Sequence, residues 1–392
     1  MKDWIEGKLE DLIEINPTVK LEKGKVYPFV SMDIITPFYK PVESIEVREF
    51  KSGGSKFYNG DTLFARITPC LENGKIAKVK NLNGGKGFGS TEFFILRGKE
   101  GITDNEFVYY LSTSKFFRKN AEKLMTGTSG RQRVDKQQFA QQIVRLPSIG
   151  IQRKIASILK NIDDKIELNN KMNKTLEGMA MTLYKHWFVD FGPFQDGEFE
   201  ESELGLIPKG WEVVNLKDVV EISYGKSLPN KKRVPGPYPV FGSSGVVGTH
   251  EFSLVKAPGI VVGRKGTIGN IFFTHEDFYP IDTTYYVTPR EKQLNYETLY
   301  CMLKQFDFKR MNNDSAVPGL NRNDAYNLQL VKPQGDIWLE FGMHIKNIFN
   351  LIKTNNDEMS WLKETRNYLL PKLLSSEIDL SEVKETVEDT LQ

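Results

Sequence analysis

Cysteine is nearly absent from this sequence: Cys70 and Cys301 are the only two among 392 residues. Two cysteines so far apart favour reduced thiols, which we expect to be buried, over a disulfide framework or a metal site. No stretch approaches the roughly 18 consecutive apolar residues that span a bilayer, and the opening MKDWIEGKLE has no apolar signal core. With 27% charged residues, the chain is expected to be a soluble, cytoplasmic protein.

Motifs of catalysis are also missing. There is no GxxxxGK[ST] phosphate loop, no Asp/Asn-Pro-Pro-aromatic motif of adenine methylation and no convincing nuclease pattern, and the four histidines lack metal-ligand spacing. Glycines alternate in GGKGFG (84–89), but the strand-like FGSTEFF that follows favours a hairpin turn over a dinucleotide site. The sequence therefore predicts a binding protein that is not an enzyme and holds no metal or cofactor itself.

The net charge of +2 is unevenly distributed. Residues 1–148 contain 24 Lys and Arg against 18 Asp and Glu, and residues 211–336 contain 15 against 13. Acidic residues prevail in 191–210, by five to one, and in 337–392, by ten to six. The positive excess in the two larger regions gives modest support to a polyanionic partner.

The chain repeats itself, and repeats decide the architecture. Aligning Trp4 with Trp211 places WIEGKLEDLIEI over WEVVNLKDVVEI without a gap. Four more segments follow in the same order, with an offset that drifts from 207 to 186 residues: 90–96 over 282–288, 107–112 over 298–303, 129–135 over 318–324, and 144–147 over 330–333. Agreement in five ordered segments predicts two similar modules.

Each module is followed by a long amphipathic helix with strict 4-3 spacing. Eight of ten seam positions are apolar in each, which is typical of a coiled coil. Asn169 and Asn355 occupy the same seam position, where a polar residue fixes register, so we expect these helices to pack on each other. Pro371 should kink or end the second helix. The alternative is two unrelated surface helices. The two series are Ile155, Leu159, Ile162, Ile166, Asn169, Asn173, Leu176, Ala180, Leu183, Trp187 and Phe341, Ile345, Ile348, Ile352, Asn355, Met359, Leu362, Arg366, Leu369, Leu373.

These observations predict an α+β fold. Two similar modules of mixed or antiparallel β-strands with short helices are separated by two long antiparallel coiled-coil helices, with pseudo-two-fold symmetry. The predicted order is module 1–148, helix 149–190, acidic linker 191–210, module 211–335, helix 336–376 and acidic C-terminal tail 377–392.

Basic and amide side chains recur at matching turns of both modules. Arginine recognises guanine edges, asparagine and glutamine recognise adenine, and small residues allow close approach to phosphates. The alternative for any one residue is a solvated turn, and for Arg66 and Arg264 an internal salt bridge. We expect phosphate contacts from Lys136, Lys226, Lys231, Lys232 and Arg233. The candidate DNA-binding residues are Arg66, Arg131, Gln132, Arg133, Lys136, Lys226, Ser243, Ser244, Arg264, Lys265, Asn321 and Arg322, with Gln132 and Arg133 aligned to Asn321 and Arg322.

The whole layout resembles the specificity subunits of Type I restriction-modification systems. LYKHWFVDFGPF (183–194) and LGLIPKGWEVVNL (204–216) are similar to the central region of that family, and LLPKLLSSEI (369–378) to its distal region. The resemblance implies two target-recognition domains that bind the halves of a split, asymmetric site on double-stranded DNA. It also implies helices that act as a spacer and dock two modification subunits.

The resemblance further implies where the chemistry of such a system resides. Modification subunits would bind S-adenosylmethionine and methylate adenine, and restriction subunits would supply ATP- and Mg-dependent translocation and cleavage. A helix of 33 residues is about 50 Å long, which suits half-sites one helical turn of DNA apart, roughly 34–36 Å. Two alternatives stay open. A coiled-coil adaptor would share the repeat but lack salt-sensitive binding to duplex DNA, and an enzyme with an unrecognised site would form product by itself when given DNA and cofactors.

Overall fold

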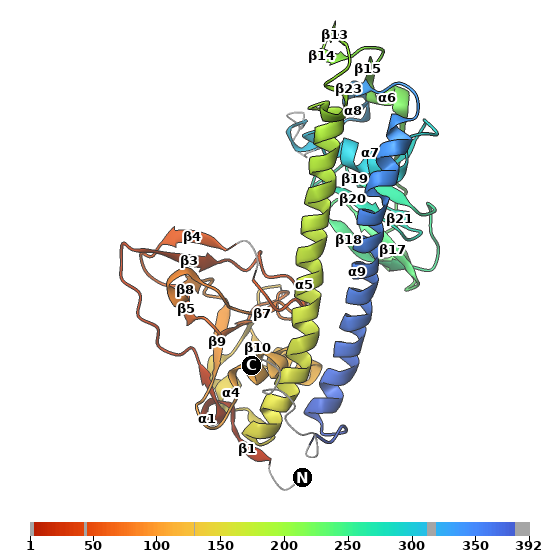
Figure 1. Ribbon diagram of the computed structural model, residues 1–392. Helices are drawn as coiled ribbons and strands as arrows, with labels where there is room; N and C mark the ends of the chain where they lie inside the picture. Colours follow the sequence, from red (N-terminus) through yellow and green to blue (C-terminus); the bar gives the residue numbers. More distant parts are fainter. Residues whose placement is uncertain (1–3, 43–44, 129, 312–318, 381–392) are drawn as a thin grey trace, which may run out of the picture. The chain divides into compact units, whose positions relative to one another are not determined.

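The computed structural model describes residues 4–42, 45–128, 130–311 and 319–380. Its contacts divide the chain into unit 1, residues 1–169 with 358–392, and unit 2, residues 170–357. This division cuts both long helices, α5 (Ile149–Phe188) and α9 (Ile337–Leu374), so each unit contains a part of each (Figure 1). Most of the predicted acidic tail, 381–392, lies outside the described residues, as do Ser129 and Pro318 of the aligned loops.

Unit 1 contains the N-terminal module. Its elements before α5 are β1 (Ile5–Lys8), α1 (Leu9–Leu12), β2 (Ile13–Ile15), β3 (Val26–Val30), β4 (Glu46–Glu49), β5 (Ser55–Tyr58), β6 (Thr62–Ala65), β7 (Ile76–Lys78), η1 (Asn83–Gly85), β8 (Lys86–Gly89), β9 (Phe93–Gly98), α2 (Asn105–Thr113), α3 (Lys115–Lys123), β10 (Met125–Thr126), β11 (Arg133–Val134), α4 (Lys136–Gln141) and β12 (Ile143–Leu146). One antiparallel sheet has the order β2-β9-β6-β7, and a second has the order β4-β3-β8-β5 with β3 and β8 parallel.

Unit 2 contains the second module. Its elements between α5 and α9 are η2 (Gly192–Phe194), β13 (Phe199–Ser202), β14 (Gly205–Pro208), β15 (Glu212–Asn215), α6 (Leu216–Val219), β16 (Val220–Tyr224), η3 (Asn230–Lys232), β17 (Tyr238–Gly242), β18 (Gly245–His250), β19 (Gly259–Gly263), β20 (Ile271–Thr274), β21 (Tyr279–Pro280), β22 (Thr284–Pro289), α7 (Tyr296–Leu303), η4 (Phe308–Arg310), α8 (Arg322–Tyr326) and β23 (Gln329–Lys332). The main sheets have the orders β16-β22-β19-β20 and β18-β17-β21, the latter with β17 and β21 parallel. The segment 191–210, expected to be a linker, contains the β13–β14 hairpin.

The predicted α+β class and internal repeat are confirmed. β1, α1 and β2 recur as β15, α6 and β16 at the offset of 207 residues, and the β1–β12 pairing recurs as β15–β23. The helices α2 and α7 also correspond, because Asp104 and Asn295 each cap their helix with a side-chain oxygen. The two-fold symmetry of the modules stays a prediction.

One aligned segment is wrong by one residue. Placing 90–96 over 282–288 equates Phe93 with Tyr285. In the sheets, however, Phe94 lies opposite Phe64, the penultimate residue of β6. Tyr285 lies opposite Val262, the penultimate residue of β19, so Tyr285 corresponds to Phe94. A one-residue shift moves every side chain to the other face of a sheet. Two consecutive aromatic residues in each segment conceal that shift in the sequence.

The long helices pair antiparallel within each unit, as predicted from their seams. In unit 1, Asn169 Nδ2 of α5 donates to Glu358 Oε2 of α9 at 2.7 Å, and in unit 2 Asn355 Nδ2 of α9 donates to Asn173 Oδ1 of α5 at 2.8 Å. Within unit 1, Asp163 also contacts Arg366, and within unit 2, Tyr184 also contacts Phe341. In each unit, residue numbers thus fall along α9 as they rise along α5. Asn169 and Asn355 are both buried, and their role in fixing the register stays a prediction. Pro371 does not end α9, which continues to Leu374.

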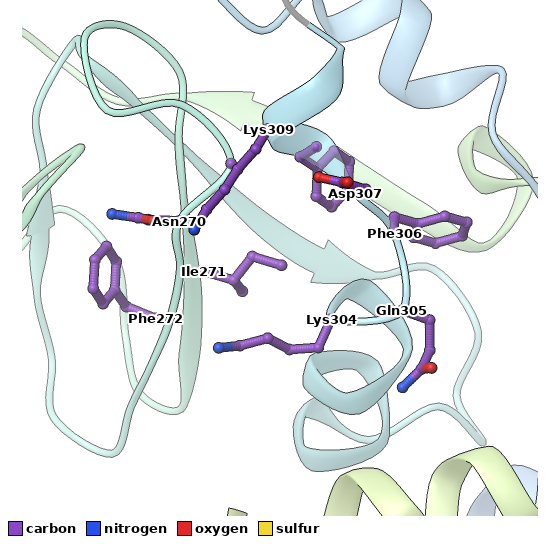
Figure 2. Close-up of a pocket in the computed structure, with 10 residues that line it drawn as sticks. Asn270, Ile271, Phe272, Lys304, Gln305, Phe306, Asp307 and Lys309 are labelled. Atoms are coloured by element: carbon purple, nitrogen blue, oxygen red, sulfur yellow. The ribbon is translucent and has the colours of Figure 1, made fainter. Parts of the chain in front are cut away.

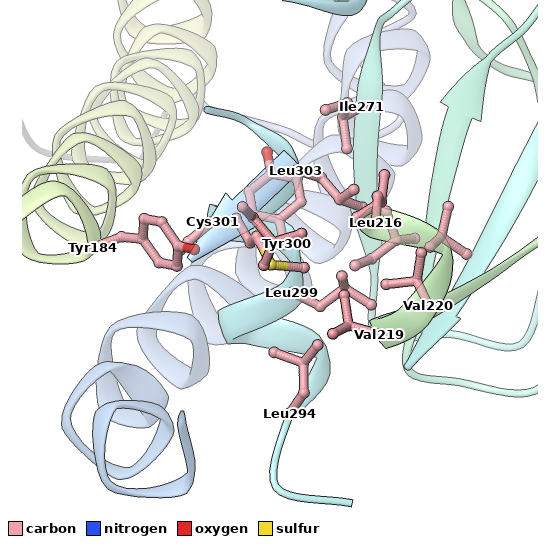
Figure 3. Close-up of a cluster of buried hydrophobic side chains, with 14 of the residues drawn as sticks. Tyr184, Leu216, Val219, Val220, Ile271, Leu294, Leu299, Tyr300, Cys301 and Leu303 are labelled. Carbon is pink, nitrogen blue, oxygen red and sulfur yellow. The ribbon is translucent and has the colours of Figure 1, made fainter. Parts of the chain in front are cut away.

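The core of unit 2 gathers side chains from helices and strands around α7 (Figure 3). Tyr184 of α5 faces this cluster, to which α6 contributes Leu216 and Val219. Cys301 lies within it, and burial raises the pKa of its thiol. Cys70 is only half-buried, so the expectation that both thiols are buried is wrong for Cys70; both cysteines are free.

The core of unit 1 contains a group of four phenylalanine rings that holds α4. The Phe139 ring of α4 stacks on Phe94 and Phe64, with centroids 5.1 and 5.5 Å away, and meets Phe117 edge-on at 5.7 Å. Aromatic contacts of this kind add to the free energy gained by burying the rings. Among the described residues, no helix is both long and apolar enough to cross a membrane.

We predict that Phe139→Ala lowers the free energy of unfolding by about 3–5 kcal/mol, because it leaves a cavity among three rings. Chemical denaturation followed by circular dichroism measures this loss. The exposed neighbour Gln138 is the matched control, and Gln138→Ala should change the same free energy by no more than about 0.5 kcal/mol. An equal effect of both substitutions would contradict the packing role of Phe139.

Candidate nucleic-acid interface

In unit 1 the segment that follows β6 pairs with the segment that precedes α4. Ile67 forms an antiparallel bridge with Arg133, and the Gln132 N–H donates to Thr68 Oγ1 at 3.0 Å although these residues are 64 positions apart. The Val134 N–H donates to the carbonyl oxygen of Arg66 at 2.8 Å. This pairing brings Arg66 beside the loop that contains Arg131, Gln132 and Arg133. We call Arg66, Arg131, Gln132, Arg133 and Lys136 the first basic face.

Two arginines of the first basic face are held by internal contacts. Arg66 Nη2 donates to the Val134 carbonyl oxygen at 3.1 Å, and its guanidinium lies 4.6 Å from the centroid of Phe94. Arg133 donates to both carboxylate oxygens of Glu92, at 2.6–2.9 Å. Those hydrogen bonds raise the pKa of Arg133. Arg66 therefore anchors the loop through a carbonyl and a ring, not through the salt bridge considered as an alternative.

Arg131 and Lys136 complete the first basic face as exposed cations. Lys136 is the first residue of α4, directly after Asp135, whose carboxylate caps the helix by accepting from the Gln138 N–H at 2.8 Å. Among the described residues, no hydrogen bond or ion pair engages the side chain of Arg131 or Lys136. Both charges are thus available to an anion in solution.

Unit 2 repeats this construction around Tyr224. The Leu320 N–H donates to the carbonyl oxygen of Arg264 at 2.9 Å, and Arg264 Nη1 donates to the Asp282 carbonyl oxygen at 2.8 Å. The guanidinium groups of Arg264 and Arg322 both lie 4.9 Å from the centroid of the Tyr224 ring. Such cation–π contacts hold flat cations at fixed positions. The structure thus brings Arg264 and Arg322 together.

Tyr285 is hydrogen-bonded to the segment that contains Leu320. Burial, followed by a hydrogen bond with Tyr224, raises the pKa of Tyr285 to about 12. The phenol therefore stays protonated at neutral pH and donates to the Leu320 carbonyl oxygen at 3.0 Å. Its ring lies 5.7 Å from the Arg264 guanidinium, as Phe94 lies beside Arg66 in unit 1.

The other predicted residues of unit 2 lie on neighbouring segments. Ser243 is half-buried, and a Cβ on Gly266 would lie 3.6 Å from its Oγ, so it adjoins the loop that follows β19. Ser244 and Lys265 are exposed. We call Ser243, Ser244, Arg264, Lys265 and Arg322 the second basic face.

A basic segment precedes β17, and its members differ in their roles. Lys226, Lys231 and Lys232 are exposed. Arg233 instead donates to the carbonyl oxygens of Leu228 and Val247, at 3.2 and 2.7 Å. Of the four predicted phosphate contacts in this segment, Arg233 is therefore the one that holds the segment to β18.

The structure shifts the equivalence of the two loops by three residues. The Val134 N–H donates to the carbonyl oxygen of Arg66, and the Leu320 N–H donates to that of Arg264, so Val134 corresponds to Leu320. The next residues, Asp135 and Asn321, are therefore equivalent, whereas the sequence alignment paired Asn321 with Gln132. Asn321 indeed caps α8 by accepting from the Asn323 N–H at 2.8 Å. Arg322 then corresponds to Lys136, not to Arg133. The predicted adenine-reading role of Asn321 competes with this capping bond.

A cavity of about 510 Å³ in unit 2 was not foreseen from the sequence (Figure 2). Gly269, Asn270 and Lys309 line it, together with residues 304–308. Asn270 Nδ2 donates to the Ser243 carbonyl oxygen at 3.5 Å, which joins the cavity to the second basic face. The sequence signal was the pair Lys309 and Arg310, which falls on Arg118 and Lys119 of the first module at the offset that relates 107–112 to 298–303.

Comparisons with known proteins agree with this organisation. The chain matches the family model described as the Type I restriction modification DNA specificity domain over residues 1–178 and 208–334. It is 24% identical to the Type I restriction enzyme MjaIX specificity subunit of Methanocaldococcus jannaschii, over 97% of this chain and 95% of the relative. It is 26% identical to the HindI specificity subunit of Haemophilus influenzae, over 96% of this chain and 100% of the relative.

A solved structure has a similar fold. The S subunit of a Type I restriction-modification system from M. genitalium aligns with a TM-score of 0.53 and 18% identity, covering 95% of this chain and 96% of that one.

We predict that Arg264→Ala lowers the free energy of unfolding by about 1–2 kcal/mol, because it removes a hydrogen bond to Asp282 and contacts with two rings. The adjacent exposed residue supplies the matched control: Lys265→Ala should change it by less than about 0.5 kcal/mol. Thermal unfolding of the two variants beside the parent measures the difference. Equal stabilities would show that Arg264 is not an anchor.

Proposed function

This chain belongs to the family of Type I restriction-modification DNA specificity proteins, and from that premise we propose that its two basic faces bind the two halves of a bipartite DNA site. One observation carries the proposal. In both units an arginine after the central strand, Arg66 or Arg264, rests on an aromatic ring, and its carbonyl oxygen accepts from the N–H of a distant segment. That segment carries the exposed Arg131 and Lys136 in unit 1 and the half-buried Arg322 in unit 2. A catalytic or purely structural role does not require such a construction twice.

Anchored and exposed cations would contribute differently to DNA binding. Exposed lysines and arginines release counterions from the duplex when they meet phosphates, which supplies salt-dependent affinity. Anchored guanidinium groups such as those of Arg133 and Arg322 lose little conformational entropy on binding and are suited to bidentate contacts with bases. We therefore assign orientation mainly to Lys136 and Lys265, and base discrimination to Arg133, to Arg322 and to the two loop residues beside Arg133, Arg131 and Gln132.

The two half-sites should differ in sequence, because the two basic faces differ at equivalent positions. Because Val134 and Leu320 make equivalent hydrogen bonds to the carbonyl oxygens of Arg66 and Arg264, Arg133 corresponds to Gly319 and Lys136 to Arg322. Different side chains at equivalent positions present different donors to the major groove. The recognised site would thus be asymmetric.

We propose that catalysis belongs to partner subunits in the cytoplasm. Two modification subunits would bring S-adenosylmethionine to adenines, and restriction subunits, where present, would use ATP and Mg. The long helices offer apolar side chains for docking: Trp361 and Tyr368 of α9, seven residues apart, are 63% and 62% exposed. Large exposed aromatic residues are typical anchors of protein interfaces.

We predict that Arg131→Ala weakens discrimination at one half-site by about tenfold and leaves the other half-site unchanged. The measurement is binding of the assembled methyltransferase to duplexes with substitutions in either half, at one fixed salt concentration. The site itself comes from sequencing adenine methylation in cells that express the complex.

Arg145→Ala is the matched control for this variant, because Arg145 is an exposed arginine of unit 1 that lies on β12, outside the loops of the first basic face. It should leave both half-sites unchanged. Equal losses at both half-sites in the Arg131 variant would contradict the assignment of one basic face to each half.

We predict that Trp361→Ala with Tyr368→Ala lowers the affinity for the modification subunit at least about tenfold. The melting temperature of the chain should stay within a few degrees, because both side chains are exposed. Calorimetric titration with the modification subunit measures the affinity. Asn367→Ala, an exposed neighbour on another side of α9, should bind as the parent does; unaltered binding by the double variant would place docking elsewhere.

A further inference from the structure

A buried ion pair joins the two long helices in unit 1. Arg366 Nη1 of α9 lies 2.6 Å from Asp163 Oδ1 of α5, and the two side chains are 11% and 5% exposed. The other carboxylate oxygen accepts from the hydroxyl of Tyr110 on α2 at 2.9 Å. That hydroxyl also accepts from Lys40 Nζ at 3.2 Å. The charges are therefore paired and hydrogen-bonded where water is excluded.

Unit 2 fills the equivalent place with apolar side chains. The long helices correspond at the offset that relates Asn169 to Asn355, so Asp163 corresponds to Phe349 and Arg366 to Ala180. Both of these residues are buried in one hydrophobic cluster. Packing alone thus does not require the ion pair, since the same architecture exists without it. Replacing a buried ion pair by apolar residues is often neutral or stabilising, so its presence calls for a role in specificity.

The apolar seam residues of α5 and α9 do not by themselves decide which helices pair. Each helix has eight apolar residues in ten seam positions, and Asn169 and Asn355 are equivalent and identical; only the second polar position differs, Asn173 in α5 and Arg366 in α9. Either helix could therefore pack antiparallel against the same helix of a second copy, an arrangement that we call self-pairing. Apolar contacts are not directional and would tolerate it.

The ion pair distinguishes self-pairing from the observed pairing. In self-pairing of α5 at the observed register, Asp163 lies opposite Ala180 of the other copy. In self-pairing of α9, Arg366 lies opposite Phe349 of the other copy. Each arrangement buries two charges without a counter-ion, which is strongly destabilising. Only pairing of α5 with α9 brings the carboxylate to the guanidinium.

We propose that Asp163 and Arg366 select the helix pairing of this protein, so that α5 pairs with α9 and neither helix pairs with its own copy. The exposed ion pair between Lys165 and Glu358, at 3.3 Å and about 40% exposed on each side, contributes little to the choice, because water screens it. The proposal goes beyond DNA recognition and holds whichever sequence the chain binds.

The test uses the full-length chain with reversed charges. Asp163→Arg and Arg366→Asp each place two like charges together in the core, so each should melt about 10 °C below the parent. The double variant restores an opposite pair and should regain at least half of that loss. Refolding the two single variants together should give a 1:1 dimer by light scattering, because each chain supplies the charge that the other needs.

The matched control reverses an exposed ion pair of α9, Lys353 and Asp357, whose charged atoms lie 2.6 Å apart. Lys353→Asp and Asp357→Lys should each melt within about 2 °C of the parent and should remain at the chain mass of 44.9 kDa when mixed. Single charge reversals at Asp163 and Arg366 that melt with the parent would overturn the proposal. So would a stable double variant whose two single variants never associate.

A double-mutant cycle of uncharged substitutions covers the case in which the reversed ion pair is unstable only because the new side chains do not fit. Asp163→Asn, Arg366→Met and their combination introduce no new charge. The combined loss in melting temperature should be clearly smaller than the sum of the single losses, because one substitution leaves the other charge unpaired. Additive losses would overturn the proposal.

A graft tests selection directly. Asp163→Phe with Arg366→Ala carries the apolar pair of unit 2 into unit 1, and Tyr110→Cys, the residue of the aligned Cys301, removes the hydroxyl that would lose its acceptor. This variant should melt near the parent, and self-pairing would no longer bury an unpaired charge. After refolding at high concentration, the dimer fraction should exceed that of the parent at least tenfold. A graft that stays as monomeric as the parent would overturn the selection of pairing by charge.

Discussion

The packing of a part of α5 against a part of α9 is the contact on which each unit depends. The two segments come from distant parts of the chain, yet both contribute to the main core of their unit. An amphipathic helix buries its apolar face only when a partner covers it. Without this pairing the seams would lie exposed, and the module in each unit would lose one wall of its core.

The modules are attached to the helices at equivalent places by different chemistry. In unit 1, Gln152 of α5 accepts from the Asp104 N–H and donates to the Ile102 carbonyl oxygen. In unit 2 the equivalent residue of α9 is the buried Trp338, and Asn295 fits directly against Gly342, which has no room for a Cβ. Hydrogen bonds join the module to the long helix in unit 1, whereas close packing of side chains joins them in unit 2. The fold therefore constrains the position of the junction more tightly than its chemistry.

Much of the architecture follows from local patterns in the sequence. The period of apolar residues predicts both long helices within two residues of their observed ends, and the Trp4–Trp211 alignment pairs β1, α1 and β2 with β15, α6 and β16. The register of 282–288 could not be found in this way, because adjacent aromatic residues satisfy either face of a strand. The equivalence of the loops failed for another reason. It depends on the hydrogen bonds of Val134 and Leu320 to Arg66 and Arg264, which join distant segments and leave no local signal.

The basic faces show why matched residue types did not identify equivalent roles. Arg133 is aligned by identity with Arg322, but the first is held by Glu92 and the second by Tyr224 and Tyr326. What the two units share is the backbone bond that places the loop beside the strand-end arginine. That bond needs only a carbonyl and an N–H group, so it leaves the side chains of the loop free to differ. A scaffold that fixes loops through the backbone can present two different sets of donors, which is the property that reading an asymmetric site requires.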